Sequence, residues 1–289
     1  MRPGNLKTRI FLDGGNPDET REIIRLIGFL DGQTTNPTLI AKNPEARGKK
    51  FSAGELIDFY REVVTTICGL IPEGSVSVEV YSDPATTAGA MLKQGKEMFS
   101  WTANAHVKFP TTREGLKAAE QAVQAGMRVN MTLNFSQEQA AAVYAATRGA
   151  RIGQVFISPF VGRLDDRGEN GMDVVANILR MYRQGDGHVE VLTASVRSLD
   201  HLLEALKLGS DIITAPFEIL KEWGGKGMPV PDAGFVYNAK NLKPIPYREI
   251  GLTKKWQDYD LRHDLTDKGI EKFSADWNAL IRPESRKIA

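Results

Sequence analysis

The chain has 289 residues, of which 42% are hydrophobic and 25% are charged, and its 37 basic and 36 acidic side chains give a formal net charge of +1. This balance is that of an ordinary globular protein and offers no electrostatic surface for nucleic acid. No apolar run reaches membrane-spanning length, and residues 1–5 lack the apolar core of a signal peptide, so we expect a cytoplasmic protein that binds neither membrane nor nucleic acid.

Short β-rich runs alternate with helical patterns along the chain. We predict eight strands, at 9–13, 32–36, 75–80, 106–109, 128–133, 154–158, 190–193 and 211–215. Eight strands that alternate with helices are the number a closed parallel barrel needs. An open doubly wound sheet is the alternative, and the lack of a Gly-x-Gly-x-x-Gly turn after the first strand counts against its dinucleotide-binding form. The prediction is α/β: one (β/α)8 TIM barrel domain spanning 1–289.

Several helices are predicted to begin at capping residues. Asn16 before Pro17 is a typical N-cap followed by proline at the first helical position. The segments 52–55, 111–114 and 136–139 fit the capping-box pattern.

The chain after the eighth strand breaks the strand–helix alternation. Residues 222–263 are rich in Gly, Pro, Tyr and Trp, and we predict an ordered insertion packed on the barrel. A C-terminal helix is predicted at 265–282, because its apolar residues keep helical spacing: Ile270, Phe273, Trp277 and Leu280.

Lys108 is the most informative single residue. It lies in a predicted strand between Val107 and Phe109, an apolar setting for a charged side chain. Burial weakens the protonation of a lysine, and an unprotonated amine attacks carbonyl groups to form a Schiff base. Its position near the C-terminal end of a strand is where catalytic groups stand in a barrel.

Other polar residues also gather at the C-terminal ends of the predicted strands. Each one taken alone fits a turn or a solvated rim. Polar groups pointing into a barrel are costly unless they converge on a site, so the set together predicts a polar pocket at that face. Its members are Asp13, Asn36, Glu79, Asn130, Thr132, Ser158, Arg163, Ser195 and Arg197.

At these positions the chain resembles the transaldolases, and most closely the small subfamily that also contains fructose-6-phosphate aldolases. The resemblance covers about 11–280. The segments that carry it are Thr34-Thr35-Asn36-Pro37-Thr38-Leu39, Val107-Lys108-Phe109-Pro110-Thr111-Thr112, Asn130-Met131-Thr132-Leu133, Ser158-Pro159-Phe160-Val161-Gly162-Arg163, Ala194-Ser195-Val196-Arg197 and Leu265-Thr266-Asp267-Lys268-Gly269.

The resemblance implies a barrel fold and a role for each matching residue. It makes Lys108 the Schiff-base lysine, Asp13 the carboxylate that moves the C4 hydroxyl proton, and Glu79 with Thr132 the holders of a water that shuttles protons. It assigns Asn36, Asn130 and Ser158 to the dihydroxyacetone moiety of the substrate. It assigns Arg163, Ser195 and Arg197 to the phosphate, which suits two arginines. Phe160, between Ser158 and Arg163, is also expected among the substrate-binding residues.

No cofactor and no metal are expected, since Schiff-base chemistry needs none and the four histidines show no ligand spacing. The expected partners are small sugar phosphates. The resemblance further implies a homo-oligomer, a ring of five or ten subunits.

Three enzymatic functions and one non-enzymatic one stay open at this point. The first is transfer of dihydroxyacetone from a ketose phosphate, fructose 6-phosphate or sedoheptulose 7-phosphate, to an aldose phosphate. The second is an aldolase that releases dihydroxyacetone, although aldolase relatives tend to carry glutamine and tyrosine where this chain has Glu79 and Phe160. The third is a transaldolase that acts on a sulfonated sugar. The fourth is a barrel that has lost catalysis, which the intact Lys108, Asp13 and Glu79 disfavour.

Overall fold

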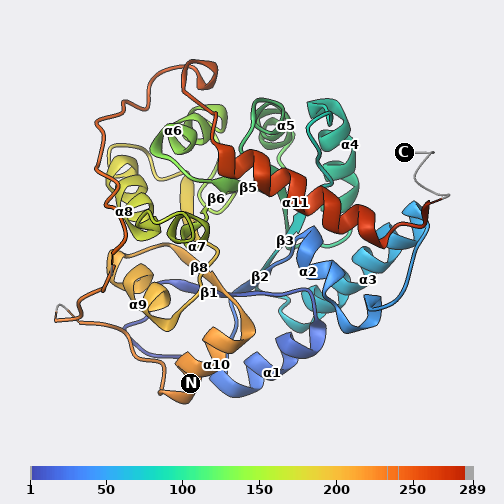
Figure 1. Ribbon diagram of the computed structural model, residues 1–289, viewed down its shortest axis with the longest axis horizontal. Helices are drawn as coiled ribbons and strands as arrows, with labels where there is room; N and C mark the ends of the chain where they lie inside the picture. Colours follow the sequence, from blue (N-terminus) through green and yellow to red (C-terminus); the bar gives the residue numbers. More distant parts are fainter. Residues whose placement is uncertain (1, 233, 240, 284–289) are drawn as a thin grey trace.

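The computed structural model describes residues 2–232, 234–239 and 241–283, and its eight strands close into one parallel barrel (Figure 1). The first strand pairs with the second on one side and with the eighth on the other, which closes the sheet. The predicted (β/α)8 barrel is therefore confirmed. The strands are β1 (Arg9–Asp13), β2 (Gly32–Thr34), β3 (Ser75–Glu79), β4 (Ala105–Pro110), β5 (Val129–Asn134), β6 (Val155–Pro159), β7 (Val189–Thr193) and β8 (Ile212–Ala215).

Helices surround the barrel (Figure 1). They are α1 (Pro17–Ile27), α2 (Pro37–Ala41), α3 (Ala53–Leu70), α4 (Ala88–Phe99), α5 (Arg113–Gln124), α6 (Gln137–Ala146), α7 (Val161–Asp165), α8 (Gly171–Tyr182), α9 (Leu199–Leu208), α10 (Phe217–Gly225) and α11 (Asp264–Leu280), with short 3₁₀ turns η1 (Pro44–Ala46) and η2 (Trp256–Asp258). Within the described part of the chain, no helix is long and apolar enough to cross a bilayer.

Two predicted helix starts have the predicted cap. The Asn16 side chain accepts from the backbone N–H of Asp18, with Pro17 at the first helical position of α1. Ser52 and Glu55 form the complete capping box of α3.

The two other predicted capping boxes are wrong in part. The cap of α5 is Thr112, not Thr111, because the Thr111 hydroxyl donates to the carbonyl of Thr132 on β5. Ser136 caps α6 as predicted, but the Gln139 side chain accepts from the N–H of Phe135 and donates to Thr266 of α11 instead of closing the box. In both cases the side chain makes a hydrogen bond to an element distant in sequence in place of the predicted capping hydrogen bond.

The second strand ends earlier than predicted, at Thr34. Asn36 is instead the N-cap of α2, where its side chain accepts from the N–H of Leu39 at 2.9 Å. Asn36 therefore lies at the start of a short helix at the mouth of the barrel, and not at the end of a strand as predicted.

The C-terminal helix α11 lies across the mouth of the barrel, against α2 and the end of β5 (Figure 1). The four residues predicted to form its apolar stripe are buried: Ile270, Phe273, Trp277 and Leu280. At one end the Thr266 hydroxyl donates to the carbonyl of Leu133 on β5, and farther along Asp276 accepts from Thr38 of α2.

The predicted insertion, 222–263, begins within α10 and contains Ala233 and Lys240, which lie outside the described residues. From 241 to 256 the chain runs along the outer helices. Lys243 exchanges backbone hydrogen bonds with the loop before α8, and Gln137 of α6 bonds to the backbone of Arg248. Trp256 donates to Glu120 of α5 at 3.2 Å. We call residues 241–256 the outer strap.

Candidate active site

Lys108 points into the barrel because its two neighbours point out of it. Side chains alternate along a strand, and Val107 and Phe109 pack against Gly95 of α4, where an added Cβ would lie 2.8 Å from the Phe109 ring. The Lys108 side chain is 4% exposed. Its Nζ donates to the carbonyl oxygen of Thr35 at 2.9 Å.

Glu79 is the charged partner of Lys108. The two residues are paired in the register of β3 and β4, and Lys108 Nζ lies 2.8 Å from Glu79 Oε2. The contact is an ion pair between two buried side chains. Burial raises the pKa of Glu79 above its ordinary value, against the opposing effect of the Lys108 charge.

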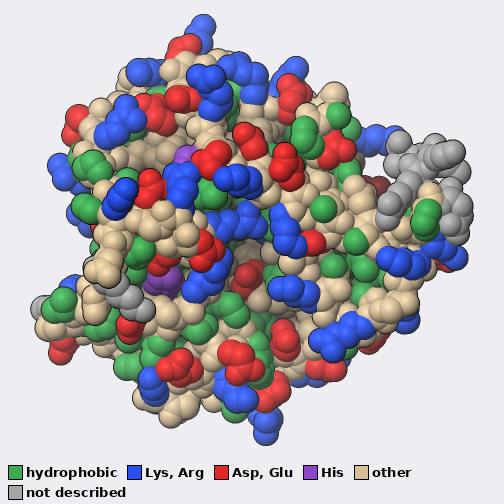
Figure 2. Space-filling view, viewed as in Figure 1, with side chains coloured by type: hydrophobic (Ala, Val, Ile, Leu, Met, Phe, Trp, Pro, Cys, Tyr) green, Lys and Arg blue, Asp and Glu red, His purple; other side chains and the backbone are tan. Residues whose placement is uncertain are grey.

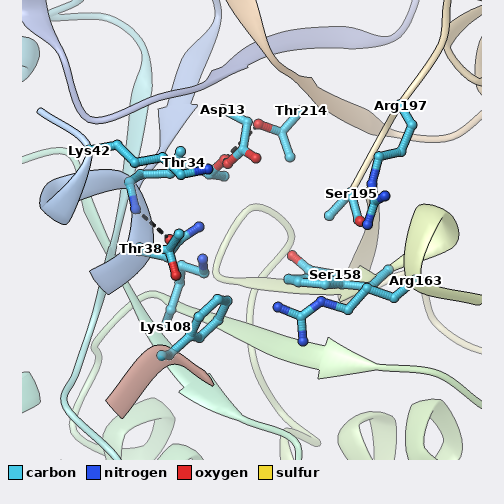
Figure 3. A pocket seen from close by; sticks show the side chains of 15 residues that line it. Asp13, Thr34, Thr38, Lys42, Lys108, Ser158, Arg163, Ser195, Arg197 and Thr214 are labelled. Carbon is cyan, nitrogen blue, oxygen red and sulfur yellow. Dashed lines mark hydrogen bonds between the residues drawn. The ribbon is translucent and has the colours of Figure 1, made fainter. Parts of the chain in front are cut away.

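Asp13 stands at the end of β1 and faces the same pocket (Figure 3). Thr34 Oγ1 donates to Asp13 Oδ1 at 2.7 Å and lies 2.6 Å from the hydroxyl of Thr214. Desolvation raises the pKa of the Asp13 carboxyl, while the charge of Lys108, the Thr34 hydrogen bond and the charge of Lys42 oppose that rise. A carboxylate with a raised pKa is a stronger base, which suits proton removal from a hydroxyl.

The floor of the barrel beside Lys108 is lined with short polar groups. Asn130 donates to Ser77 Oγ at 3.1 Å, and Ser158 donates to Asn130 Oδ1 at 2.7 Å. Thr132 Oγ1 is buried and, among the described residues, has no hydrogen-bond partner. Buried oxygens in this state call for a water or a ligand.

Arg163 and Arg197 lie together at one end of the pocket (Figure 3). Gly162 permits this approach, because a Cβ there would lie 2.4 Å from Arg197 Cγ and 2.5 Å from the carbonyl oxygen of Ser195. Ser195 itself adopts the left-handed region, with φ of 58°, and its carbonyl accepts from the N–H of Gly162. Strained backbone of this kind is common at binding sites.

The two arginines have different surroundings. The Arg163 guanidinium lies over the rings of Phe160 and Phe273, at 5.4 and 5.2 Å from their centroids. Burial lowers its pKa from the ordinary value. Arg197 is more exposed and forks Asp166 through two hydrogen bonds of 3.0 and 2.8 Å.

The pocket opens on the face that α11 crosses, where Figure 2 shows a hollow near the centre with Lys and Arg side chains gathered around it. Eight of the eleven predicted site residues line the pocket: Asp13, Asn36, Lys108, Ser158, Phe160, Arg163, Ser195 and Arg197. The remaining three, Glu79, Asn130 and Thr132, are buried in the barrel beneath it.

The sequence prediction missed several lining residues: Thr34, Thr38, Lys42, Thr214 and Phe273. Thr34 and Thr214 end strands, so the rule used for the other polar residues could have found them. Lys42 directly follows α2 and Phe273 lies in α11, and no local signal in the sequence directs them to the pocket. Lys42 extends toward Asp13 in Figure 3.

No group of three or more His, Cys, Asp or Glu side chains is arranged to hold a metal ion in the ranges 2–232, 234–239 and 241–283. The chemically active groups that the pocket and the barrel interior beneath it bring together are the amines of Lys42 and Lys108, two carboxylates and two guanidinium groups.

Comparison with known proteins shows which family the chain matches. The family model described as "Transaldolase/Fructose-6-phosphate aldolase" matches residues 10–283. A protein named "Probable transaldolase" from Dehalococcoides mccartyi is 36% identical over 94% of this chain and 99% of its own length. A second with that name, from Methanococcus maripaludis, is 35% identical over 94% of this chain and 98% of its own length. Among solved structures, the 3-hexulose-6-phosphate synthase of Salmonella typhimurium aligns over 76% of this chain and 99% of its own, at 10% identity and a TM-score of 0.49, a likeness too weak to bear on function.

Proposed function

Because this chain belongs to the transaldolase/fructose-6-phosphate aldolase family, we propose that it is a transaldolase that works through a Schiff base on Lys108. It moves a dihydroxyacetone unit from a ketose phosphate, fructose 6-phosphate or sedoheptulose 7-phosphate, to an aldose phosphate. The observation that carries the proposal is the buried Lys108 amine, with the Glu79 carboxylate 2.8 Å away and Asp13 in the same pocket.

The proposed reaction begins when the unprotonated amine of Lys108 attacks C2 of the ketose. Water leaves and an iminium forms. Asp13 then takes the proton of the C4 hydroxyl, the C3–C4 bond breaks, and its electron pair passes into the iminium as an enamine. The aldose phosphate leaves. The enamine carbon then attacks the carbonyl carbon of an acceptor aldehyde, and the same steps in reverse, ending in hydrolysis of the iminium, release the new ketose from Lys108. Two carboxylates in different environments suit this division of acid and base work.

The proposed binding mode follows the polarity of the pocket. Asn36, Asn130 and Ser158 surround the three carbons next to Lys108, and Arg163, Ser195 and Arg197 take the terminal phosphate. Guanidinium groups form charge-assisted, often bidentate hydrogen bonds with phosphate oxygens. A sulfonate is also an anion with three oxygens, so a sulfonated sugar is the second candidate substrate.

Borohydride trapping tests the Schiff base. Reduction in the presence of fructose 6-phosphate should add the mass of the reduced ketose adduct to the peptide that contains Lys108. Lys108→Arg should abolish both trapping and turnover, because guanidinium stays protonated and cannot attack a carbonyl. Trapping on a different lysine, with Lys108 unmodified, would remove the assignment.

A coupled assay tests transfer against release. The protein is given fructose 6-phosphate with and without erythrose 4-phosphate, while glyceraldehyde 3-phosphate and free dihydroxyacetone are followed. A transaldolase makes glyceraldehyde 3-phosphate in multiple turnovers only with the acceptor. A parallel arm with 6-deoxy-6-sulfofructose as donor compares the two anions. If dihydroxyacetone forms without the acceptor as fast as the transfer product forms with it, the aldolase function takes first place.

Glu79→Gln should raise the share of turnover that ends in free dihydroxyacetone. Release requires a proton on the enamine carbon, and a neutral amide handles a bound water differently from a carboxylate. The measurement is the ratio of dihydroxyacetone to transfer product. Glu190→Gln serves as the control, since Glu190 pairs with Arg9 at the opposite end of the barrel strands. An unchanged ratio in Glu79→Gln would show that Glu79 does not control release.

A further inference from the structure

Tyr60 of α3 reaches from outside the barrel to both of the residues that contact the Lys108 amine. Its side chain is fully buried. The Tyr60 hydroxyl lies 2.7 Å from Thr35 Oγ1 and accepts from the backbone N–H of Glu79 at 2.9 Å. Thr35 and Glu79 are the two residues that hold Lys108 Nζ, one through its carbonyl oxygen and the other through its carboxylate.

The direction of each hydrogen bond in this group can be assigned. The Thr35 hydroxyl gives its single proton to the carbonyl of Ser77, at 2.8 Å. Thr35 Oγ1 therefore accepts from Tyr60, and the Tyr60 oxygen accepts from Glu79 N–H. The result is a chain that runs from Glu79 N–H through Tyr60 and Thr35 to Ser77, in which each hydroxyl both donates and accepts. Such chains strengthen their members cooperatively and fix their geometry.

We propose that Tyr60 is a positioning residue for Lys108, which ties Thr35 of the β2–α2 loop to Glu79 of β3 so that the amine is held between them. The inference rests on the proposed role of Lys108 as nucleophile. Tyr60 does not line the pocket and has no contact with substrate in this assignment, so it acts only through Thr35 and Glu79.

The aromatic surroundings hold the Tyr60 ring in place. Trp101 packs against it edge-on, with centroids 5.8 Å apart, and Trp277 of α11 packs at 5.7 Å. Burial raises the pKa of Tyr60, so its hydroxyl stays a donor throughout the working pH range. A phenylalanine fills the same space, which makes Tyr60→Phe a removal of the hydroxyl alone.

The test measures how fast the ketose is trapped on Lys108, separately from how tightly it binds. Borohydride trapping in single turnover should be slower in Tyr60→Phe by about ten- to a hundredfold, the scale for a small misplacement of a reacting group. The dissociation constant for fructose 6-phosphate should change by less than about twofold, because no group that contacts the sugar is removed. The pH profile of the trapping rate should also shift, since the surroundings of the amine change.

Tyr182→Phe is the matched control. Its hydroxyl is also buried and donates to the carbonyl of Ala140 at 2.8 Å, between α8 and α6 and away from the pocket. This variant should lose comparable stability but trap at the wild-type rate. Thr35→Val should trap as slowly as Tyr60→Phe, Thr35→Ser should restore the rate, and the double variant Tyr60→Phe/Thr35→Val should be no slower than either single one.

Four outcomes would each overturn part of the argument. A wild-type rate in Tyr60→Phe overturns the positioning role, as does an equal loss in Tyr182→Phe, which would indicate a general effect of stability. A double variant whose loss is the product of the two single losses overturns the shared chain of hydrogen bonds. Failure of the wild-type protein to trap on Lys108 would instead overturn the proposed function, and the two failures are thereby distinguished.

Discussion

Arg163 and Arg197 both face the anion end of the pocket, but only one of them has a carboxylate partner. Arg197 is paired with Asp166, whereas Arg163 lies between two aromatic rings, and no carboxylate among the described residues lies within ion-pair distance of it. A desolvated cation without a counter-ion gains most from an arriving anion. Arg163 is therefore expected to supply more of the phosphate affinity than Arg197.

Arg163→Ala should cost about 2–5 kcal/mol in catalytic efficiency toward phosphorylated sugars, the range for truncating one member of a buried charge pair. Arg197→Ala should cost less, and both losses should be far smaller with unphosphorylated sugars. Steady-state kinetics on both substrate types measure this difference. Arg167→Ala is the control, because that arginine pairs with Glu169 and Asp264 outside the pocket. Equal losses on both sugar types would mean that these arginines are structural.

His106 makes the stability of the fold depend on pH. It is buried on β4, where its Nδ1 lies 2.7 Å from Ser75 Oγ and its Nε2 3.0 Å from the carbonyl of Gly153. Desolvation lowers the pKa of His106 to about 3. Between that value and the ordinary 6.5, the unfolded chain binds a proton that the folded chain does not.

The free energy of unfolding should therefore fall as the pH drops from 6.5 toward 3, and His106 alone should account for about 1.4 kcal/mol per pH unit. Urea denaturation at several pH values measures the slope. His106→Asn should lower stability near neutral pH but give a shallower fall on acidification. A slope unchanged by the substitution would show that other groups dominate acid sensitivity.

Among the elements, strands were more predictable than helix caps. The strands are short β-rich runs that alternate with helical patterns, and each of the eight was predicted within two residues of its observed bounds. Whether a side chain caps a helix depends on whether another element of the fold offers it a competing hydrogen bond. Thr111 and Gln139 both have the right spacing for a capping box, yet one bonds to β5 and the other to α11, which lie far away in sequence.

Helix α11 and Arg163 meet at a single glycine. A Cβ on Gly269 would lie 2.7 Å from Arg163 Nη1 and 2.5 Å from Leu133 Cδ2. Gly269→Ala must therefore move either the helix or the guanidinium. We expect KM for phosphorylated sugars to rise about tenfold, the cost of losing part of a charged hydrogen bond.

Gly89→Ala is the control for this substitution. Gly89 lies in α4, and nothing stands within 4 Å of its added Cβ, so alanine should raise stability by about 0.4–1 kcal/mol and leave kinetics unchanged. Thermal unfolding and steady-state kinetics separate the two effects. A KM for Gly269→Ala equal to that of the wild-type protein would mean that α11 can shift without disturbing Arg163.

On the scale of the whole molecule, the site could be predicted where it stands at strand ends or in the segments that resemble the family. The C-terminal ends of parallel barrel strands meet at one face, so the proximity of Asp13, Lys108 and Ser158 could be predicted from the strand assignments alone. The positions of Lys42, Tyr60 and Phe273 depend on how α2, α3 and α11 pack, and that packing is set by many weak contacts without a local pattern. The resemblance to a family implied roles for individual residues, but it did not predict which residues of these helices lie at or near the pocket.

The outer strap is held to the barrel by the buried side chains of Ile250, Leu252 and Trp256 and by a few polar contacts. Arg148, beyond the end of α6, donates to the carbonyls of Leu252 and Lys254 at 2.5 and 2.8 Å. Arg148→Ala should speed amide hydrogen exchange in 250–256 while leaving exchange in the barrel strands unchanged. Arg151→Ala is a nearby surface control. Faster exchange throughout the barrel would show instead that the strap supports the core.

Because β1 pairs with β8, the barrel cannot close during synthesis until the eighth strand has been made. Roughly 200 residues lie between the two strands, and at a synthesis rate of about 5–20 residues per second they take about 10–40 s to appear. During that interval β1 has only β2 to pair with, and its other edge is open to unwanted partners. Asp13 is thus synthesised long before β8, and Phe273 is the last of the pocket-lining residues to be synthesised.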